Sequence, residues 1–219
     1  MKTCKLAAFL FVTILASTFQ TNAANKTPKA PEPIRASPSL DLAGVSFGQP
    51  IAIQECPSQL IAKDYRAYRS EYEIKAPDKP CWKHSYTSKP TTPLPNSGKV
   101  SVIPENQFPG VKDINVKLID GIVEDITLIT YGEGVQDKIY ASLVQKYGSP
   151  TTREVTKAQN RMGAEFSNIV AEWKFTNLTV SFAGIIGSID TGIVSASTPK
   201  AENAQAAERR ERESAEPKL

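Results

Sequence analysis

Asp190, Thr191 and Gly192 match the tripeptide that carries the catalytic carboxylate of aspartic proteases. Those enzymes need two copies of the aspartate that share a proton, so that one acts as a base and the other as an acid. This chain contains one copy, which only a homodimer could double. Ile193 follows where those proteases usually have a small residue, and little core-forming sequence comes after it. We therefore predict that Asp190 lies in a turn between two strands, where Asp supplies a local hydrogen bond and Gly a positive φ angle.

His84 is the only histidine of the chain and lies next to a cysteine in the segment CWKHSY. A catalytic triad or a histidine-based metal site would depend on it, yet no residue in the sequence is marked as a nucleophile to pair with it. The sequence also lacks the ligand spacing of zinc sites, a phosphate-binding loop and a dinucleotide fingerprint. We predict no catalytic residue, no metal site and no cofactor, and we interpret His84 as a surface residue.

Asp120, Glu124 and Asp125 form a cluster of carboxylates. Two carboxyl groups can act as an acid and a base when their separation suits the reaction, and the sequence does not give that separation. Asp120 belongs to the dipeptide Asp120–Gly121 and the other two follow it closely, and charged residues at the end of a hairpin usually serve solubility. A hydrolase that uses this cluster, or a dimeric Asp190, is therefore the third functional hypothesis, after the two non-catalytic ones given at the end of this section.

The first 23 residues have the layout of a secretory signal peptide. Lys2 and Lys5 precede an apolar run, and small and polar residues then lead to Ala23. The apolar run is about half as long as the ~20 residues that span a bilayer. No later segment is long and apolar enough, so we predict no transmembrane segment after removal of the signal and a periplasmic or secreted protein.

Removal of the signal peptide changes both the cysteine count and the charge. Cys4 leaves with it, and Cys56 and Cys81 stay, which predicts one disulfide bond in an exported protein. Taking Lys2 and Lys5 from a chain of formal charge +3 leaves +1. The sequence therefore gives no electrostatic reason to expect nucleic acid as a partner.

Composition divides the rest of the chain into three segments. Residues 24–40 form a Pro/Ala-rich linker without a periodic apolar face. Residues 41–198 are about 160 residues long, which suits a single domain. Residues 199–219 contain no aromatic residue and only Leu219 among the large aliphatic residues, which predicts a charged disordered tail.

Two kinds of periodicity indicate the elements of the domain. The segment DINVKLIDGIVEDITLIT alternates on both sides of Asp-Gly, which predicts a hairpin with a change of phase in its second strand. Helical spacing from about Val135 to Tyr147 predicts a helix that Gly148 ends. Two further strands are expected around Asn177, with Trp173 on the core face.

The segment before Cys81 has the least regular pattern. Residues 51–65 fit a short helix or an irregular turn. Arginines and tyrosines then interleave and could stack on a ligand or a single nucleic-acid strand, but we favour tyrosines packed under a disulfide-closed loop. The residues concerned are Tyr65, Arg66, Tyr68, Arg69 and Tyr72.

Five segments together resemble small exported proteins of Gram-negative bacteria, mostly of unknown function. The segments are LAGVSFGQPIAIQECP, VKLIDGIVEDITLITYG, LVQKYGSPT, EWKFTNLTVSF and IDTGIVSAST, within about residues 41–198. The resemblance implies a periplasmic or envelope-associated α+β domain, and it assigns no catalytic residue.

We therefore predict an α+β fold, in which a mainly antiparallel sheet has one principal helix packed on one face and one disulfide, Cys56–Cys81. The leading functional hypothesis is a non-catalytic periplasmic binding or protein-interaction module with an unknown partner in the cell envelope. The second is a secreted inhibitor of a cell-wall hydrolase such as lysozyme, acting through the loop between the two cysteines.

Overall fold

The computed structural model of the chain describes residues 40–62, 65–68, 73–75, 78–84, 96–160 and 162–215. These residues all belong to one compact unit that spans residues 34–219. The predicted signal peptide, 1–23, and nearly all of the predicted linker, 24–40, lie outside the described residues.

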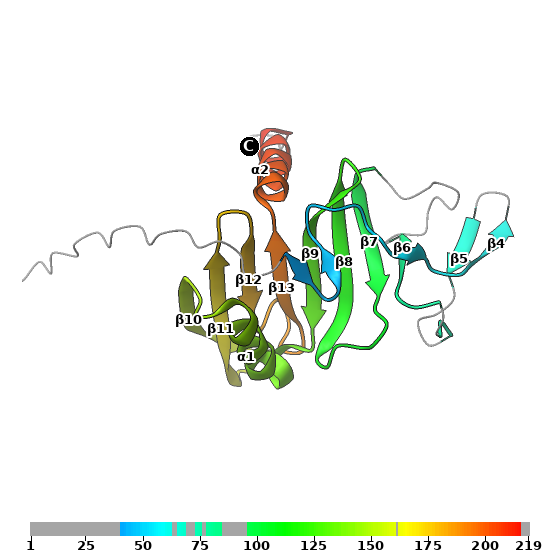
Figure 1. The fold of residues 1–219 in the computed structure, drawn as a ribbon. Helices are drawn as coiled ribbons and strands as arrows, with labels where there is room; N and C mark the ends of the chain where they lie inside the picture. The colour runs from blue at the N-terminus through cyan, green and yellow to red at the C-terminus, as the bar shows by residue number, and fades with distance from the viewer. Residues whose placement is uncertain are drawn as a thin grey trace, which may run out of the picture. The chain divides into compact units, whose positions relative to one another are not determined.

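The described part is built around a nine-stranded sheet with the order β10-β11-β12-β13-β9-β8-β7-β6-β3 (Figure 1). All neighbours in it are antiparallel except β3 and β6, which are parallel. The strands are β3 (Gln54–Glu55), β6 (Cys81–His84), β7 (Gly98–Ile103), β8 (Val111–Ile119), β9 (Ile122–Thr130), β10 (Thr152–Gln159), β11 (Glu165–Lys174), β12 (Thr179–Ala183) and β13 (Gly192–Ser197). The predicted α+β fold with a mainly antiparallel sheet is confirmed.

The β8–β9 hairpin follows the predicted pattern. Asp120 and Gly121 both have positive φ angles, 55° and 75°, as the two-residue turn requires. The register shifts between Lys117 and Leu118, so that one extra residue of β9 enters the pair. Residues 123–126 are consequently all buried, which is the predicted change of phase.

One face of the sheet is covered. The helix α1 (Gln136–Tyr147) follows a short 3₁₀ helix, η1 (Gly132–Val135), and packs on β11 through Leu143 and Tyr147. Gly148 ends α1 with a φ angle of 76°, and its carbonyl oxygen accepts a hydrogen bond from Nε1 of Trp173 at 2.8 Å. The predicted helix and its packing on one face are confirmed.

The same face is covered further along by a small hairpin, β1 (Asp41–Leu42) and β2 (Val45–Ser46). Leu42, Val45 and Phe47 join the core that β7, β8 and β9 form. Figure 1 shows α1 and this hairpin on the same side of the sheet.

Two segments differ from the sequence prediction. Residues 51–65 contain no helix where they are described, but carry β3 and a separate hairpin of β4 (Ser58–Ala62) and β5 (Tyr65–Tyr68). Residues 199–215, predicted as part of a disordered tail, form the helix α2 (Pro199–Ala215). Its Ala, Glu and Arg residues favour helix, and Thr198 caps it by accepting a hydrogen bond from the backbone N–H of Ala201.

Among the residues described, no helix is long and apolar enough to cross a membrane.

Candidate functional site

Asp190 lies in the loop that connects β12 to β13, as predicted for a turn. Its carboxylate is exposed and accepts a hydrogen bond from the hydroxyl of Ser188. That bond, followed by a backbone hydrogen bond and the positive charge of Lys112, lowers the pKa of Asp190 below its usual value. The carboxylate is therefore engaged within its own turn.

The glycine of the tripeptide has a role different from the predicted one. Gly192 is not among the glycines with a positive φ angle, whereas Gly187 in the same loop has φ 66°. A Cβ atom on Gly192 would overlap the carbonyl oxygen of Gly184 and Oγ1 of Thr130. Gly192 is thus required because β9 and the end of β12 approach it closely.

His84 is half-buried in β6 rather than on the surface, so that interpretation was wrong. Its ring meets the ring of Trp82 edge-on, with the centroids 5.2 Å apart. Its Nε2 is buried and has no hydrogen-bond partner among the described residues. Across those residues, no group of three or more His, Cys, Asp or Glu side chains could hold a metal ion.

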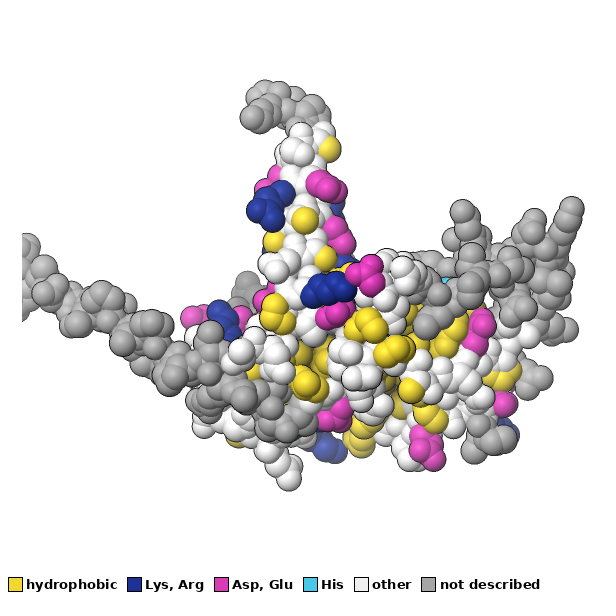
Figure 2. Space-filling model, turned by 45° about the horizontal axis from the view of Figure 1, so that its top comes forward, with side chains coloured by type: hydrophobic (Ala, Val, Ile, Leu, Met, Phe, Trp, Pro, Cys, Tyr) yellow, Lys and Arg dark blue, Asp and Glu magenta, His cyan; other side chains and the backbone are white. Residues whose placement is uncertain are grey.

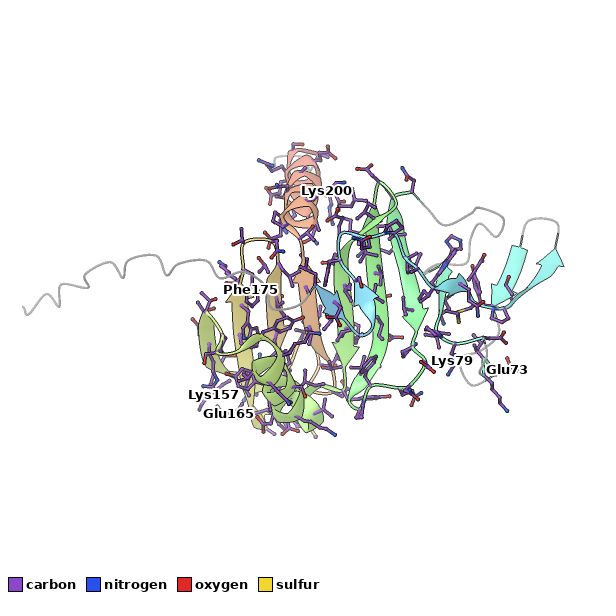
Figure 3. All side chains as sticks on the ribbon, viewed as in Figure 1. Glu73, Lys79, Lys157, Glu165, Phe175 and Lys200 are labelled. Atoms are coloured by element: carbon purple, nitrogen blue, oxygen red, sulfur yellow. A yellow bond between two sulfur atoms is a disulfide. The ribbon has the colours of Figure 1, made fainter. Side chains whose placement is uncertain are left out.

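Two of the three carboxylates of the β8–β9 hairpin, Asp120 and Glu124, share Lys200, whose Nζ lies 3.8 Å from Glu124, and Asp125 has other partners. Asp120 is exposed and forms an ion pair of 2.8 Å with Nζ of Lys200 at the base of α2 (Figure 3). Glu124 is buried and accepts a hydrogen bond from the hydroxyl of Thr198. Asp125 is also buried and accepts one from the hydroxyl of Ser197. Glu124 and Asp125 therefore anchor the start of α2, and the prediction that they serve solubility was wrong.

The predicted disulfide is present between Cys56 and Cys81. It packs with Ile74 and Ile103 in a small second core. Tyr68 packs against this core and donates a hydrogen bond of 2.7 Å to Oε1 of Glu55, as expected for a tyrosine under the loop. The side chains of the other tyrosines and arginines named above for this loop lie outside the described residues.

The face of the sheet opposite α1, which we call the open face, carries a row of polar side chains. Except on the edge strand β10, whose residues are nearly all exposed, these positions alternate along each strand with core residues, so they point away from the core. Successive cross-strand partners in the row are Lys83, Ser101, Asn115, Thr127, Ser195, Ser181, Glu172 and Thr152. The five central members are small and uncharged, and Ser101 donates a hydrogen bond of 3.1 Å to Asn115.

One end of this row opens into a hollow of about 340 Å³, the loop hollow, beside the 104–110 connection of β7 and β8. Lys83 and Ser101 of the row line it, together with two exposed aromatic residues, Phe108 and Tyr131. Nζ of Lys112 lies 5.1 Å from the centre of the Tyr131 ring and donates a hydrogen bond to the carbonyl oxygen of Asp190.

A second hollow of about 430 Å³, the helix hollow, lies between the row and α2. Thr127 and Ser195 of the row line it, so Asn115 is the row member that separates the two hollows. Its charged lining is Lys99, Lys117, Arg209, Arg212, Asp125 and Glu208. Figure 2 shows side chains of both charges along α2.

No family model, curated protein or solved structure matches the chain.

The open-face row was not predicted from the sequence. Its members come from strands that are distant in the sequence, and only the register of the sheet aligns them. A signal was present in each strand, since Asn115, Thr127 and Ser195 are each the small polar residue between two buried apolar ones.

Proposed function

We propose that this protein is an exported, non-catalytic protein-interaction module of the cell envelope that binds its partner with the open face of the sheet. The observation that carries the proposal is the row of small uncharged side chains across the open face, which borders both the loop hollow and the helix hollow. The opposite face is occupied by α1 and the β1–β2 hairpin, so it is less suited to a partner.

Short side chains make such a surface suitable for recognition. Ser, Thr and Asn lose little rotamer entropy on contact and can donate or accept hydrogen bonds, so they adapt to a partner's polar groups. The exposed rings of Phe108 and Tyr131 at the loop hollow add apolar area of the kind that often anchors an interface. The surface therefore combines an adaptable centre with an aromatic margin.

Export is supported by two features of different origin. Residues 1–23 have the layout of a signal peptide, and Cys56 and Cys81 are joined by a disulfide, which persists in oxidising compartments.

A photo-crosslinking amino acid tests the recognition surface. It replaces Ser181, which is exposed in the row, and, in a matched control, Gln145, which is exposed on α1. After irradiation in the native envelope, we expect one protein to be captured reproducibly from position 181 and not from position 145. Equal capture from both positions, or capture from position 145 alone, would contradict the proposal.

The hydrolase inhibitor is the second candidate, because the disulfide closes a loop that presents the β4–β5 hairpin. An inhibitor of this kind should block lysozyme digestion of cell walls at an equimolar ratio. Reduction of the disulfide should weaken the block. Undiminished digestion at about 100 μM protein, on the order of a hundred times the dissociation constant of a micromolar inhibitor, excludes lysozyme as the target.

A further inference from the structure

The helix hollow is lined by four basic residues and by only two carboxylates that could neutralise them. Of its two carboxylates, Asp125 is buried and its oxygens accept hydrogen bonds from Ser195, Ser197 and Thr127. Only Glu208 forms an ion pair there, with Nζ of Lys117 at 2.8 Å. Within the described residues, Lys99 and Arg209 form no ion pair.

The sheet itself places like charges together at this hollow. Lys99 on β7 and Lys117 on β8 are direct cross-strand partners. Like charges in directly opposite positions destabilise a sheet. Lys117 is balanced by Asp125, its partner on β9, and by Glu208, whereas Lys99 forms no ion pair within the described part of the chain. A negatively charged ligand would supply the missing partner of Lys99.

Glu208 shows which chemistry the hollow accepts. Its carboxylate is half-exposed and contacts Lys117, the less exposed partner of the pair. The hydrogen bond from Lys117, and then the positive charges of Lys117, Arg212 and Lys99, lower the pKa of Glu208. The molecule thus already holds one carboxylate of its own at this position.

We propose that the helix hollow binds an acidic segment of the partner protein, whose carboxylates contact Lys99, Lys117 and Arg212. This inference rests on the proposed interaction function and adds the chemistry of the partner. The basic residues of the helix hollow are grouped beside α2, whereas the rest of the open face carries Lys83 together with the carboxylates of Asp113 and Glu172. A short acidic peptide fits that distribution, while the continuous phosphate backbone of a nucleic acid needs a longer basic track.

Anisotropy of a fluorescent hexaglutamate peptide tests the inference on the chain without residues 1–23, with hexaglutamine as the peptide control. We expect Lys99→Glu and Arg212→Glu each to raise the dissociation constant at least about fivefold, because attraction becomes repulsion. Lys138→Glu changes an exposed lysine on α1, away from the helix hollow, and should leave the dissociation constant unchanged. Glu208→Gln removes the ion pair with Lys117, which frees Lys117 for the peptide and should lower the dissociation constant.

Circular dichroism of each variant confirms that it is folded. Equal weakening by Lys138→Glu would show a general charge effect and overturn the inference, as would binding of a hexanucleotide in preference to hexaglutamate. If hexaglutamate does not bind while position 181 still captures a partner selectively, the acidic segment is wrong and the open face stands. If selective capture at position 181 fails, the interaction function fails with it.

Discussion

At the scale of single residues, Gly192 lies where β9 and the end of β12 leave no space for a side chain. A Cβ atom there would overlap Oγ1 of Thr130 and the backbone oxygen of Gly184, and the backbone cannot move aside easily. We expect Gly192→Ala to lower the free energy of unfolding by about 2–3 kcal/mol, which urea denaturation would measure.

Gly134 provides the matched control for this substitution. A Cβ atom on it would meet nothing within 4 Å, and its φ angle is not positive. Gly134→Ala should therefore leave stability unchanged or raise it by up to about 1 kcal/mol, since alanine restricts the unfolded chain. Equal effects of the two substitutions would disprove the close approach at Gly192.

Tyr147 makes stability depend on alkaline pH. Burial, and secondly the charge of Asp41, raise the pKa of Tyr147 to about 12 from an ordinary value of 10.0. A raised pKa of an acid means that the folded protein retains a proton which the unfolded chain releases. The contribution is therefore complete below pH 10 and is lost as pH rises toward 12.

We expect the free energy of unfolding to fall by about 2 kcal/mol over that range through Tyr147 alone. Tyr147→Phe isolates the effect, because it removes the titrating group and only a long hydrogen bond of 3.5 Å to Asp41. The stability difference between wild type and variant, measured by urea denaturation at several pH values, should change between pH 10 and 12. A difference that is constant with pH would contradict the raised pKa.

At the scale of elements, α2 depends on its base. Only Ala201 of its residues is buried, so the helix gains little from apolar packing. Its 17 residues are only slightly more than the ~12–15 below which an isolated helix is marginal in water. Hydrogen bonds from Thr198 and Gln205 to two buried carboxylates of β9, Glu124 and Asp125, instead hold it in place. Ion pairs of Lys200 and Glu208 with the β8–β9 hairpin add to them.

Removal of one of these carboxylates should loosen α2 without unfolding the sheet. Asp125→Ala leaves the hydroxyls of Ser195 and Ser197 without their acceptor, at a cost of about 1–3 kcal/mol. Hydrogen exchange measured by mass spectrometry should become faster in the backbone amides of residues 199–215. The amides of β11 should exchange at nearly the same rate as in the wild type. Asp137→Ala on the exposed side of α1 is the control, and unchanged exchange in α2 would show that Asp125 does not anchor it.

The elements that could be predicted from the sequence are those whose pattern is local. Alternation around Asp120–Gly121 and helical spacing up to Tyr147 each depend on a few consecutive residues. The strand β10 escaped prediction because nearly all its residues are exposed at the edge of the sheet, so no apolar alternation marks it. The helix α2 escaped because polar contacts to β9 take the place of an apolar face.

At the scale of the whole molecule, the sheet separates two kinds of surface. Its covered face holds the large apolar side chains, such as Trp173 and Phe182, under α1. Its open face holds the small polar row and the two hollows. This division could not be predicted in detail, because the partners Asn115, Thr127 and Ser195 come together only through the register of three strands.

The Cys56–Cys81 disulfide acts on the whole molecule through the unfolded chain. It joins residues 25 positions apart, and closing a loop of that length removes conformational entropy equivalent to about 3 kcal/mol. We expect the reduced protein, without residues 1–23, to have a free energy of unfolding lower by about that amount in urea denaturation. The effect should appear in every structural probe of unfolding, because a constraint on the unfolded chain acts on the entire transition. The variant with both Cys56→Ala and Cys81→Ala should not respond to the reductant, which controls for effects of the reductant itself. A loss confined to a probe near β3, with the main transition unchanged, would show instead that the disulfide only holds the edge strand to β6.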